Sequence, residues 1–215
     1  MARIGLLGGS FNPAHRGHRR ISLAAMDALG LDEVWWLVSP GNPLKDGAKD
    51  MAPFEARFAS AEQMARRAPI VVSDFERREG TRYTVDTVRK LQARHPGHRF
   101  IWLLGSDTLP KFHEWRDWRG LARSLAIAVI RRPGYDYQAR AVRAMGWLRR
   151  FVHPPSQAKQ WTKWSAPAII FLRLPPDTSS ATAIRSQHPS WYRRLQRLAL
   201  RGTFIGAPLV RQETP

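Results

Sequence analysis

The sequence predicts an α/β fold in which helices cover both faces of a doubly wound parallel sheet. Two observations support this: short apolar runs without polar alternation recur along the chain, and segments with apolar residues at helical spacing separate them. Strands that are apolar on both faces are typical of parallel sheets covered on both sides. The arrangement is Rossmann-like, and ligands then bind at the carboxyl ends of the strands. The predicted strands are residues 4–7, 33–39, 70–73, 100–104, 125–130 and 168–172.

The segments between and after these strands carry helical patterns. The expected helices cover residues 21–29, 53–68, 85–95, 137–150 and 190–200. Thr84 is the expected N-cap of the third helix, because a hydroxyl directly before a periodic apolar segment is a start signal. The fourth helix is basic, and Pro154 and Pro155 follow its end. The tail from residue 206 is expected to be loosely held.

Length and composition favour one domain over residues 1–215, with a core over about 3–187. A basic insert is expected over about 137–165, and a C-terminal helix and tail over 188–215. The chain is 43% hydrophobic, but no apolar run is long enough to span a membrane. We expect no cleavable leader before the first strand, and the chain has no cysteine. We therefore expect a cytoplasmic protein without a membrane partner.

The formal net charge of +18 is the largest departure from average composition. Residues 137–176 contain no Asp or Glu, and seven basic residues fall there: Arg140, Arg143, Arg149, Arg150, Lys159, Lys163 and Arg173. Such a surface attracts phosphate substrates and polyanions. A solvated basic surface is the favoured explanation, and dedicated nucleic-acid binding is the alternative. We expect no specific nucleic-acid partner.

One glycine-rich stretch, Gly8-Gly9-Ser10-Phe11-Asn12-Pro13-Ala14-His15-Arg16-Gly17-His18, joins the first strand to the first helix. A strand, a glycine-rich turn and a helix start together form a phosphate-binding arrangement, since backbone amides and the positive helix end face the anion. His15 and His18 add donors for charge that develops on a phosphoryl group. Capping of the helix by one histidine and packing of the other beneath the loop is the structural alternative.

This stretch resembles the nucleotidyltransferases built around the motif H-x-G-H, and in particular the bacterial nicotinate-nucleotide adenylyltransferases. The resemblance covers residues 3 to about 185 and implies adenylyl transfer from ATP to nicotinate mononucleotide, giving deamido-NAD and pyrophosphate. It implies His15, His18 and Arg185 as catalytic residues. The ATP-binding residues that it implies are Gly8, Gly9, Ser10, Phe11, His15, His18, Gly105, Asp107, Ser180, Thr182 and Arg185.

The second element of the resemblance is the segment 180–185, which is similar to the family's Ser-x-Thr-x-x-Arg signature. A pair of hydroxyls at a helix start with an arginine one turn later can grip phosphate, and the planar fork of arginine matches phosphate oxygens. The resemblance implies that Ser180 and Thr182 hold the triphosphate. It implies that Arg185 holds the departing pyrophosphate.

A third group would bind the acceptor. Asn42 and Lys45 stand where the family has a basic substrate loop, and Lys45 could neutralise either the mononucleotide phosphate or the ATP phosphates. Tyr83 and Thr84 resemble a Tyr-Thr-x-x-Thr segment suited to the nicotinate carboxylate, because a helix start with amides and a hydroxyl receives carboxylates. A plain N-cap role for Thr84 is compatible with that function.

The segment after the fourth strand resembles the family's Gly-x-Asp and Phe-x-x-Trp elements. It implies that Asp107 bonds a ribose hydroxyl and that Trp115 stacks on the pyridine ring. Trp118 is the competing candidate for stacking. The segment 132–135 also matches the family, and its backbone would border the adenine.

The sequence leaves some alternatives open. The same fold could take nicotinamide mononucleotide or phosphopantetheine as acceptor, or could serve a non-catalytic basic protein that binds nucleic acid. No cluster of His or carboxylate residues suggests a protein-built metal site, so Mg²⁺ is expected to arrive with ATP, held by phosphate oxygens and water. A homo-oligomer is possible on sequence grounds.

Overall fold

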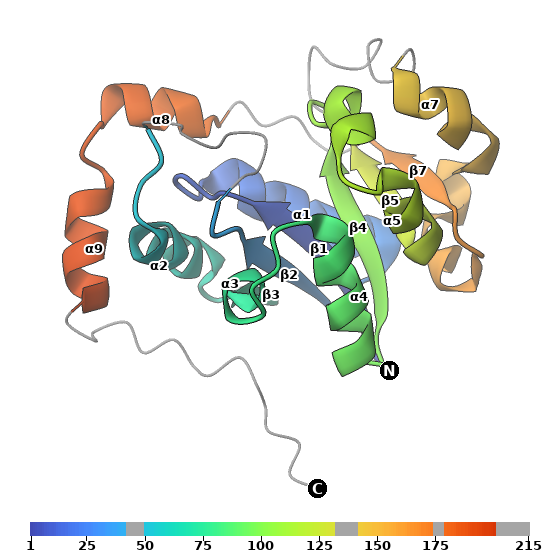
Figure 1. The fold of residues 1–215 in the computed structure, drawn as a ribbon, viewed down its shortest axis with the longest axis horizontal. Helices are drawn as coiled ribbons and strands as arrows, with labels where there is room; N and C mark the ends of the chain where they lie inside the picture. Colours follow the sequence, from blue (N-terminus) through green and yellow to red (C-terminus); the bar gives the residue numbers. More distant parts are fainter. Residues whose placement is uncertain (42–49, 132–141, 174–178, 201–215) are drawn as a thin grey trace, which may run out of the picture.

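The centre of the protein is a parallel sheet of seven strands in the order β3-β2-β1-β4-β5-β7-β6 (Figure 1). The computed structural model describes residues 1–41, 50–131, 142–173 and 179–200. Within them the strands are β1 (Arg3–Gly9), β2 (Glu33–Val38), β3 (Ile70–Ser73), β4 (Arg99–Gly105), β5 (Ala126–Ile130), β6 (Val152–His153) and β7 (Ile169–Leu172). Every strand pairing is parallel. The predicted Rossmann-like α/β fold is confirmed.

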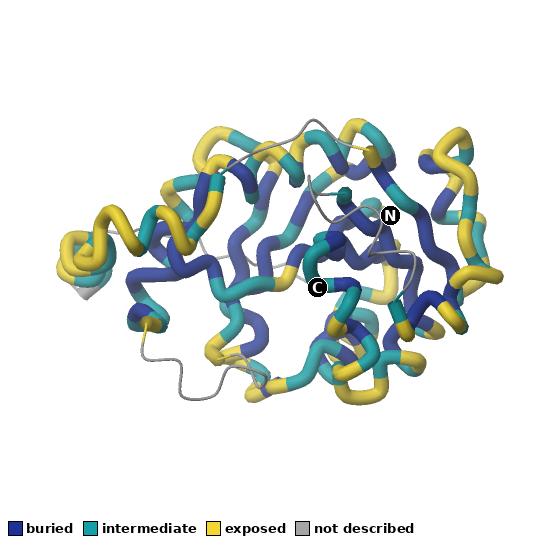
Figure 2. Tube along the Cα trace, turned by 90° about the horizontal axis from the view of Figure 1, so that it is seen from above, coloured by how far each residue is buried: buried dark blue, intermediate teal, exposed yellow. Residues whose placement is uncertain are grey.

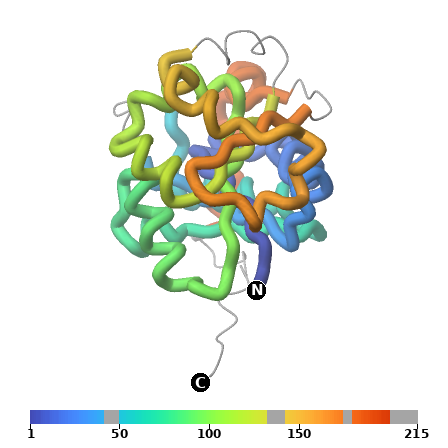
Figure 3. The backbone as a smooth tube through the Cα atoms, turned by 90° about the vertical axis from the view of Figure 1, so that its right-hand side faces the viewer, coloured from blue at the N-terminus to red at the C-terminus, as the bar shows by residue number. Residues whose placement is uncertain are grey.

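The six predicted strands are present, each within two residues of its expected ends, and one further strand was not predicted. This is β6, which pairs beside β7 at the edge of the sheet. Two residues carry no detectable period, so no sequence pattern could have revealed it. In Figure 3, the segment 150–172 that contains it lies in front of the other strands.

Helices cover both faces of the sheet. One face packs on α1 (Arg16–Leu29), α2 (Phe54–Ala65) and the 3-10 helix η4 (Pro155–Lys163). The other face packs on α3 (Phe75–Arg78), α4 (Thr84–Arg94), η2 (Leu109–Glu114), α5 (Trp118–Ser124) and α7 (Arg143–Leu148), which the short turn η3 (Arg149–Phe151) follows. Figure 2 shows the strands as a buried layer, with the exposed residues on the outer surfaces of the helices. This explains why the strands lack polar alternation.

Three predicted helix details were wrong. Thr84 is the first residue of α4 and not its N-cap; Tyr83 holds that position in an extended conformation, with no side chain capping the helix. The second helix ends at Ala65, because Arg66 (φ −49°, ψ 138°) leaves the helical conformation and Arg67 has a left-handed backbone (φ 56°). Among the described residues of the predicted basic helix, 142–150, only α7 is α-helical and a 3-10 turn follows it; the expected start of the helix lies outside the described residues.

The order of the strands determines where a site can form. The chain adds β2 and β3 on one side of β1, and then places β4 and β5 on the other side. The order therefore reverses between β1 and β4, and in sheets of this kind ligands bind beyond the carboxyl ends of the strands at that point. Those ends are Gly9 and Gly105.

The C-terminal helices lie on the side of the molecule opposite β7. The helix α9 (Tyr192–Leu200) packs on α2, and α8 (Ala181–Gln187) lies by the chain that leads into α2 (Figure 1). The sequence predicted the last helix with a start two residues earlier. This placement of α8 brings the second predicted motif to the same end of the sheet as the first.

Candidate active site

The glycine-rich turn between β1 and α1 packs closely against the neighbouring strand β4. A Cβ atom added to Gly8 would lie 2.8 Å from the indole of Trp102 on β4, a distance that real side chains do not tolerate. Phe11 has a left-handed backbone (φ 47°) and is buried, and its ring stacks on Trp36 at a centroid distance of 5.0 Å. The turn therefore has a shape that tertiary packing imposes.

The two histidines of the motif cap the start of α1 together. The Gly17 N–H donates to Nδ1 of His15 at 3.1 Å, and the His15 N–H donates to Nδ1 of His18 at 3.2 Å. In a neutral imidazole whose Nδ1 accepts, the proton sits on Nε2. Capping therefore makes Nε2 the donating nitrogen of both rings, so the capping role and the phosphate-binding role are compatible.

Packing holds the two imidazoles in one place. Their ring centroids are 3.9 Å apart, and the ring of Phe11 lies 4.9 Å from that of His18. His15 is buried, His18 is half-buried, and Arg16 between them is exposed. Side chains restrained in this way lose little entropy when they bind a phosphate.

The segment 180–185 lies against this turn. Ser180 is the N-cap of α8, its Oγ accepting from the Ala183 N–H at 3.4 Å. Arg185 donates from Nη1 to the Asn12 carbonyl oxygen at 2.8 Å, and its Nη2 lies 3.3 Å from Oγ1 of Thr182. Nη2 also pairs with the Asp50 carboxylate at 2.9 Å. The structure therefore brings the two predicted motifs into direct contact.

Sequence reasoning missed the residues that organise the loops around this contact. The Asn12 side chain is buried; it donates to the Asp50 carbonyl oxygen at 2.9 Å and accepts from the Ala52 N–H at 3.1 Å. Arg57 on α2 is 1% exposed, and its guanidinium donates four hydrogen bonds to backbone carbonyl oxygens. Burial lowers the pKa of Arg57 to about 10, so the guanidinium remains charged at neutral pH. The sequence did contain one sign of this role, because Arg57 stands on the apolar face of α2.

Beside the start of α4 lies a buried polar cluster of Glu76, Thr81 and Thr87. The Thr87 hydroxyl oxygen is 3.2 Å from Oε1 of Glu76 and 2.9 Å from Oγ1 of Thr81. Burial raises the pKa of Glu76 to about 7, and the contact with Thr87 opposes that rise. The cluster holds the segment that carries Tyr83 and Thr84 against α3.

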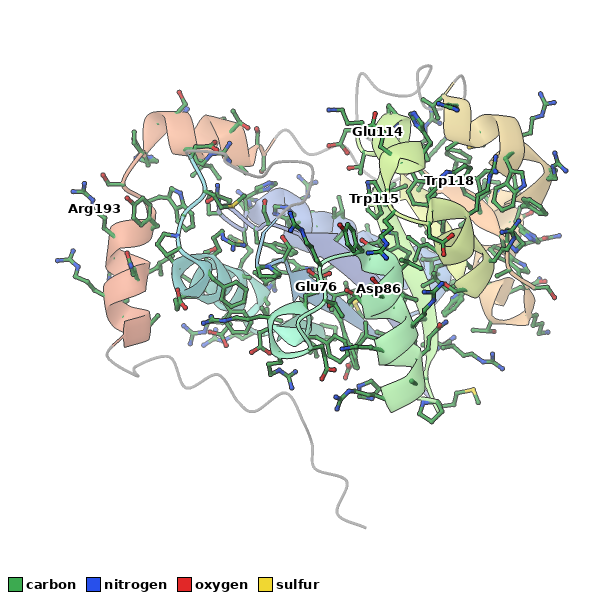
Figure 4. All side chains as sticks on the ribbon, viewed as in Figure 1. Glu76, Asp86, Glu114, Trp115, Trp118 and Arg193 are labelled. Atoms are coloured by element: carbon green, nitrogen blue, oxygen red, sulfur yellow. The ribbon has the colours of Figure 1, made fainter. Side chains whose placement is uncertain are left out.

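Trp115 and Trp118 have different surroundings. Trp115 follows η2 and packs edge-on against Trp102 at 6.2 Å, next to the glycine-rich turn. Trp118 packs edge-on against Trp147 of α7 at 5.5 Å, and Figure 4 shows it farther toward α7 than Trp115. Gly105 and Asp107 lie at the carboxyl end of β4. Of the two tryptophans, Trp115 is the one that packs against a residue in contact with the turn.

Several predicted site residues lie outside the described residues. These are Asn42 and Lys45 of the predicted acceptor loop, and residues 132–135, predicted to border the adenine. Within the described ranges, no group of three or more His, Cys, Asp or Glu side chains could hold a metal ion. No helix in the same ranges has the length and apolar character needed to cross a bilayer.

Known proteins similar to this chain are nucleotidyltransferases. Residues 6–187 match the family described as cytidylyltransferase-like. A relative from Erythrobacter litoralis, named a probable nicotinate-nucleotide adenylyltransferase, is 58% identical over 189 residues, which cover 88% of this chain and 86% of the relative. The chain belongs to this nucleotidyltransferase family. A relative of the same name from Parvibaculum lavamentivorans is 49% identical, over 86% of this chain and 92% of its own length.

Solved structures of the family share the fold. The nicotinic acid mononucleotide adenylyltransferase of Plasmodium falciparum, solved in complex with NaAD, superposes with a TM-score of 0.63. The match covers 94% of this chain and 98% of the other at 16% identity. At that identity the similarity is evidence of the fold alone. The expectation of an enzyme of the nucleotidyltransferase type is confirmed by the sequence relatives.

Proposed function

We propose that this protein transfers an adenylyl group from ATP to nicotinate mononucleotide, forming deamido-NAD and pyrophosphate in NAD biosynthesis. The observation that carries the proposal is the contact between Arg185 and the Asn12 carbonyl, which joins the H-x-G-H turn to the C-terminal signature where the strand order reverses. The named relatives support the choice of acceptor.

The chemistry needs alignment and charge stabilisation rather than a covalent enzyme intermediate. A phosphate oxygen of the mononucleotide attacks the α-phosphorus of ATP in line. The new P–O bond forms as the bond to the bridging oxygen of the β-phosphate breaks, and pyrophosphate leaves with that electron pair. Negative charge on the transferred group meets the Nε2–H donors of His15 and His18 and the positive start of α1.

Arg185 is proposed to hold the departing pyrophosphate. Its guanidinium lies one turn into α8 and beside Thr182, so a phosphate oxygen can bond both residues. Ser180 is the N-cap of the same helix, and we propose that its hydroxyl also bonds the triphosphate. Gly8, Gly9, Ser10 and Phe11 are proposed to line the triphosphate from the other side.

The acceptor is proposed to bind between α4 and the end of η2. No side chain caps α4, so its first amides and the Thr84 hydroxyl can receive the nicotinate carboxylate. Tyr83 borders this end of the helix. Trp115 is proposed to stack on the pyridine ring, and Asp107 to bond a ribose hydroxyl. Asn42 and Lys45 are proposed to contact the mononucleotide phosphate.

Enzymes of this type act on ATP with a divalent metal ion, and we propose that the ion is Mg²⁺. The described residues do not form a cluster that fits a protein-built site. Mg²⁺ binds through few protein ligands when phosphate oxygens and water complete its shell. We propose that the protein acts in the cytoplasm, because its named relatives are metabolic enzymes of bacteria.

A pyrophosphate-release assay tests the function. The purified protein is incubated with ATP, Mg²⁺ and one acceptor at a time: nicotinate mononucleotide, nicotinamide mononucleotide or phosphopantetheine. Release with the nicotinate form and appearance of deamido-NAD are expected. Faster release with either other acceptor would replace the assignment. No release, together with RNA binding that survives high salt, would indicate a nucleic-acid-binding protein instead.

A further inference from the structure

Arg57 connects loops that come from three different parts of the chain. Its Nη1 donates to the Ser10 carbonyl oxygen at 2.7 Å and to the Ser39 carbonyl oxygen at 2.8 Å. Nη2 reaches the Pro40 carbonyl oxygen at 3.1 Å, and Nε reaches the Ala52 carbonyl oxygen at 3.0 Å. One buried side chain thus fixes the turn after β1, the chain after β2 and the approach to α2.

These three segments are the glycine-rich turn and the described residues before and after the predicted acceptor loop. Ser10 belongs to the glycine-rich turn on the ATP side. Ser39 and Pro40 lead into the predicted acceptor loop, whose other end is held where Asn12 bonds Asp50 and Ala52. Arg57 therefore joins the glycine-rich turn to the described residues on either side of the predicted acceptor loop.

A guanidinium is suited to this task because its donors spread over a rigid plane. Arg57 forms no ion pair with a carboxylate of the described residues. The buried charge is solvated by carbonyl dipoles, and removing it would leave those carbonyls without their donor. A lysine, with its donors on one nitrogen, cannot reach four carbonyls on three segments.

We infer that Arg57 is a positioning residue that fixes the turn after β1 relative to residues 39–40 and 52, on either side of the predicted acceptor loop, so that the two substrates meet in line. This inference rests on the proposed function, because it concerns the alignment of ATP with its acceptor. Misplacing reacting groups by about 1 Å can lower a rate by roughly 10²-fold. The loss should appear in kcat, since each substrate retains most of its own contacts.

The test uses Arg57→Lys, with Arg57→Met as a second variant and Arg19→Lys as the matched control. Arg19 also donates to two backbone carbonyl oxygens, those of Met64 and Arg66 at 2.9 Å each, but at the far end of α2. All variants are assayed for pyrophosphate release with ATP and nicotinate mononucleotide. Calorimetric titration with α,β-methylene-ATP gives the fraction of protein that binds nucleotide.

We expect both Arg57 variants to lose about 10²-fold in kcat while each KM changes by less than about threefold, with binding stoichiometry near one. Stoichiometry matters because a partly unfolded sample also lowers the apparent kcat. Arg19→Lys should stay within about twofold of the parent enzyme.

Three results would overturn the inference. Arg57→Lys with parental kcat would mean that charge suffices and the spread of donors is irrelevant. An equal loss in Arg19→Lys would mean that α2 anchoring in general is responsible, and failure of both Arg57 variants to fold would make Arg57 a folding requirement. A parent protein that releases no pyrophosphate would instead contradict the proposed function.

Discussion

The guanidinium of Arg185 donates to the carbonyl oxygen of Asn12 at 2.8 Å, across 173 residues of sequence. The same side chain pairs with the Asp50 carboxylate and contacts Thr182. One arginine thus lies against the H-x-G-H turn, the loop before α2 and its own helix. The two motifs form one site because of this contact.

Arg185→Lys is expected to reduce the efficiency with which the enzyme uses ATP. A lysine can replace one contact but not the set, and a charge-assisted bond contributes about 1.5–3 kcal/mol, so kcat/KM for ATP should fall by roughly tenfold or more. Steady-state kinetics with varied ATP measure it. Asp50→Asn is the control: the Asp50 side chain is 62% exposed, and exposed ion pairs contribute little. Parental ATP kinetics in Arg185→Lys would refute the assignment.

Two substitutions separate the roles of His18. His18→Asn keeps an acceptor near Nδ1 for the His15 N–H but removes the Nε2 donor, and should lower kcat by roughly 10²–10³-fold with little change in melting temperature. His18→Gln places an amide near Nε2 and should recover part of the rate. Turnover in His18→Asn close to the parent value would exclude His18 as a donor to the reacting phosphate.

Acceptor preference should depend on the start of α4. We expect nicotinate mononucleotide to be favoured over the nicotinamide form by about tenfold or more, because a carboxylate makes charge-assisted bonds that an amide cannot. Thr84→Val removes the hydroxyl at constant shape and should reduce that ratio. The ratio of kcat/KM values measures it. Equal turnover of both acceptors by the parent enzyme would contradict the carboxylate assignment.

Glu76 should make stability depend on pH. Its folded pKa of about 7 lies above the ordinary value of 4.5, so between these values the folded protein retains a proton that the unfolded chain has lost. The free energy of unfolding therefore falls as pH rises through this window, by on the order of 3 kcal/mol at about 1.4 kcal/mol per pKa unit.

Glu76→Gln should remove this fall and melt higher than the parent at about pH 8, while matching it near about pH 5. Denaturant unfolding across the window measures it. Glu55→Gln is the control, since the pKa of Glu55 is lowered by a backbone hydrogen bond and the hydrogen bond from Arg77, with burial opposing this. A Glu76→Gln protein with the parental pH profile would show that Glu76 does not carry the dependence.

Trp115 and Trp118 should fail in different ways when truncated. Trp115→Ala should raise the KM for nicotinate mononucleotide by about tenfold, in line with about 1–3 kcal/mol for an aromatic stack on a base. Trp118→Ala should mainly lower the melting temperature, since Trp118 packs on Phe112 and Trp147. The KM for nicotinate mononucleotide and the melting temperature of both variants show which tryptophan stacks on the substrate. The reverse pattern would make Trp118 the stacking residue.

Most of the fold was predictable because its signals are local. The strands are continuous apolar runs and the helices have a clear period, so both can be recognised without knowledge of the partners. The start of α4 and the end of α2 were misplaced by one to three residues, because Tyr83 and Arg67 take backbone conformations that the sequence does not specify. The two-residue β6 has no local signal at all.

The sequence by itself determined the chemistry available at the site: the glycine turn, His15 and His18, and the signature that ends in Arg185. Only the tertiary structure decided how these parts are held together. The bonds from Arg185 to Asn12 and from Arg57 to three separate loops join residues distant in the chain, and no local pattern encodes them. A buried arginine among alanines looks like a break in an apolar face until its carbonyl partners are seen. Hydrogen bonds that depend on how strands are ordered are therefore visible only in the folded protein.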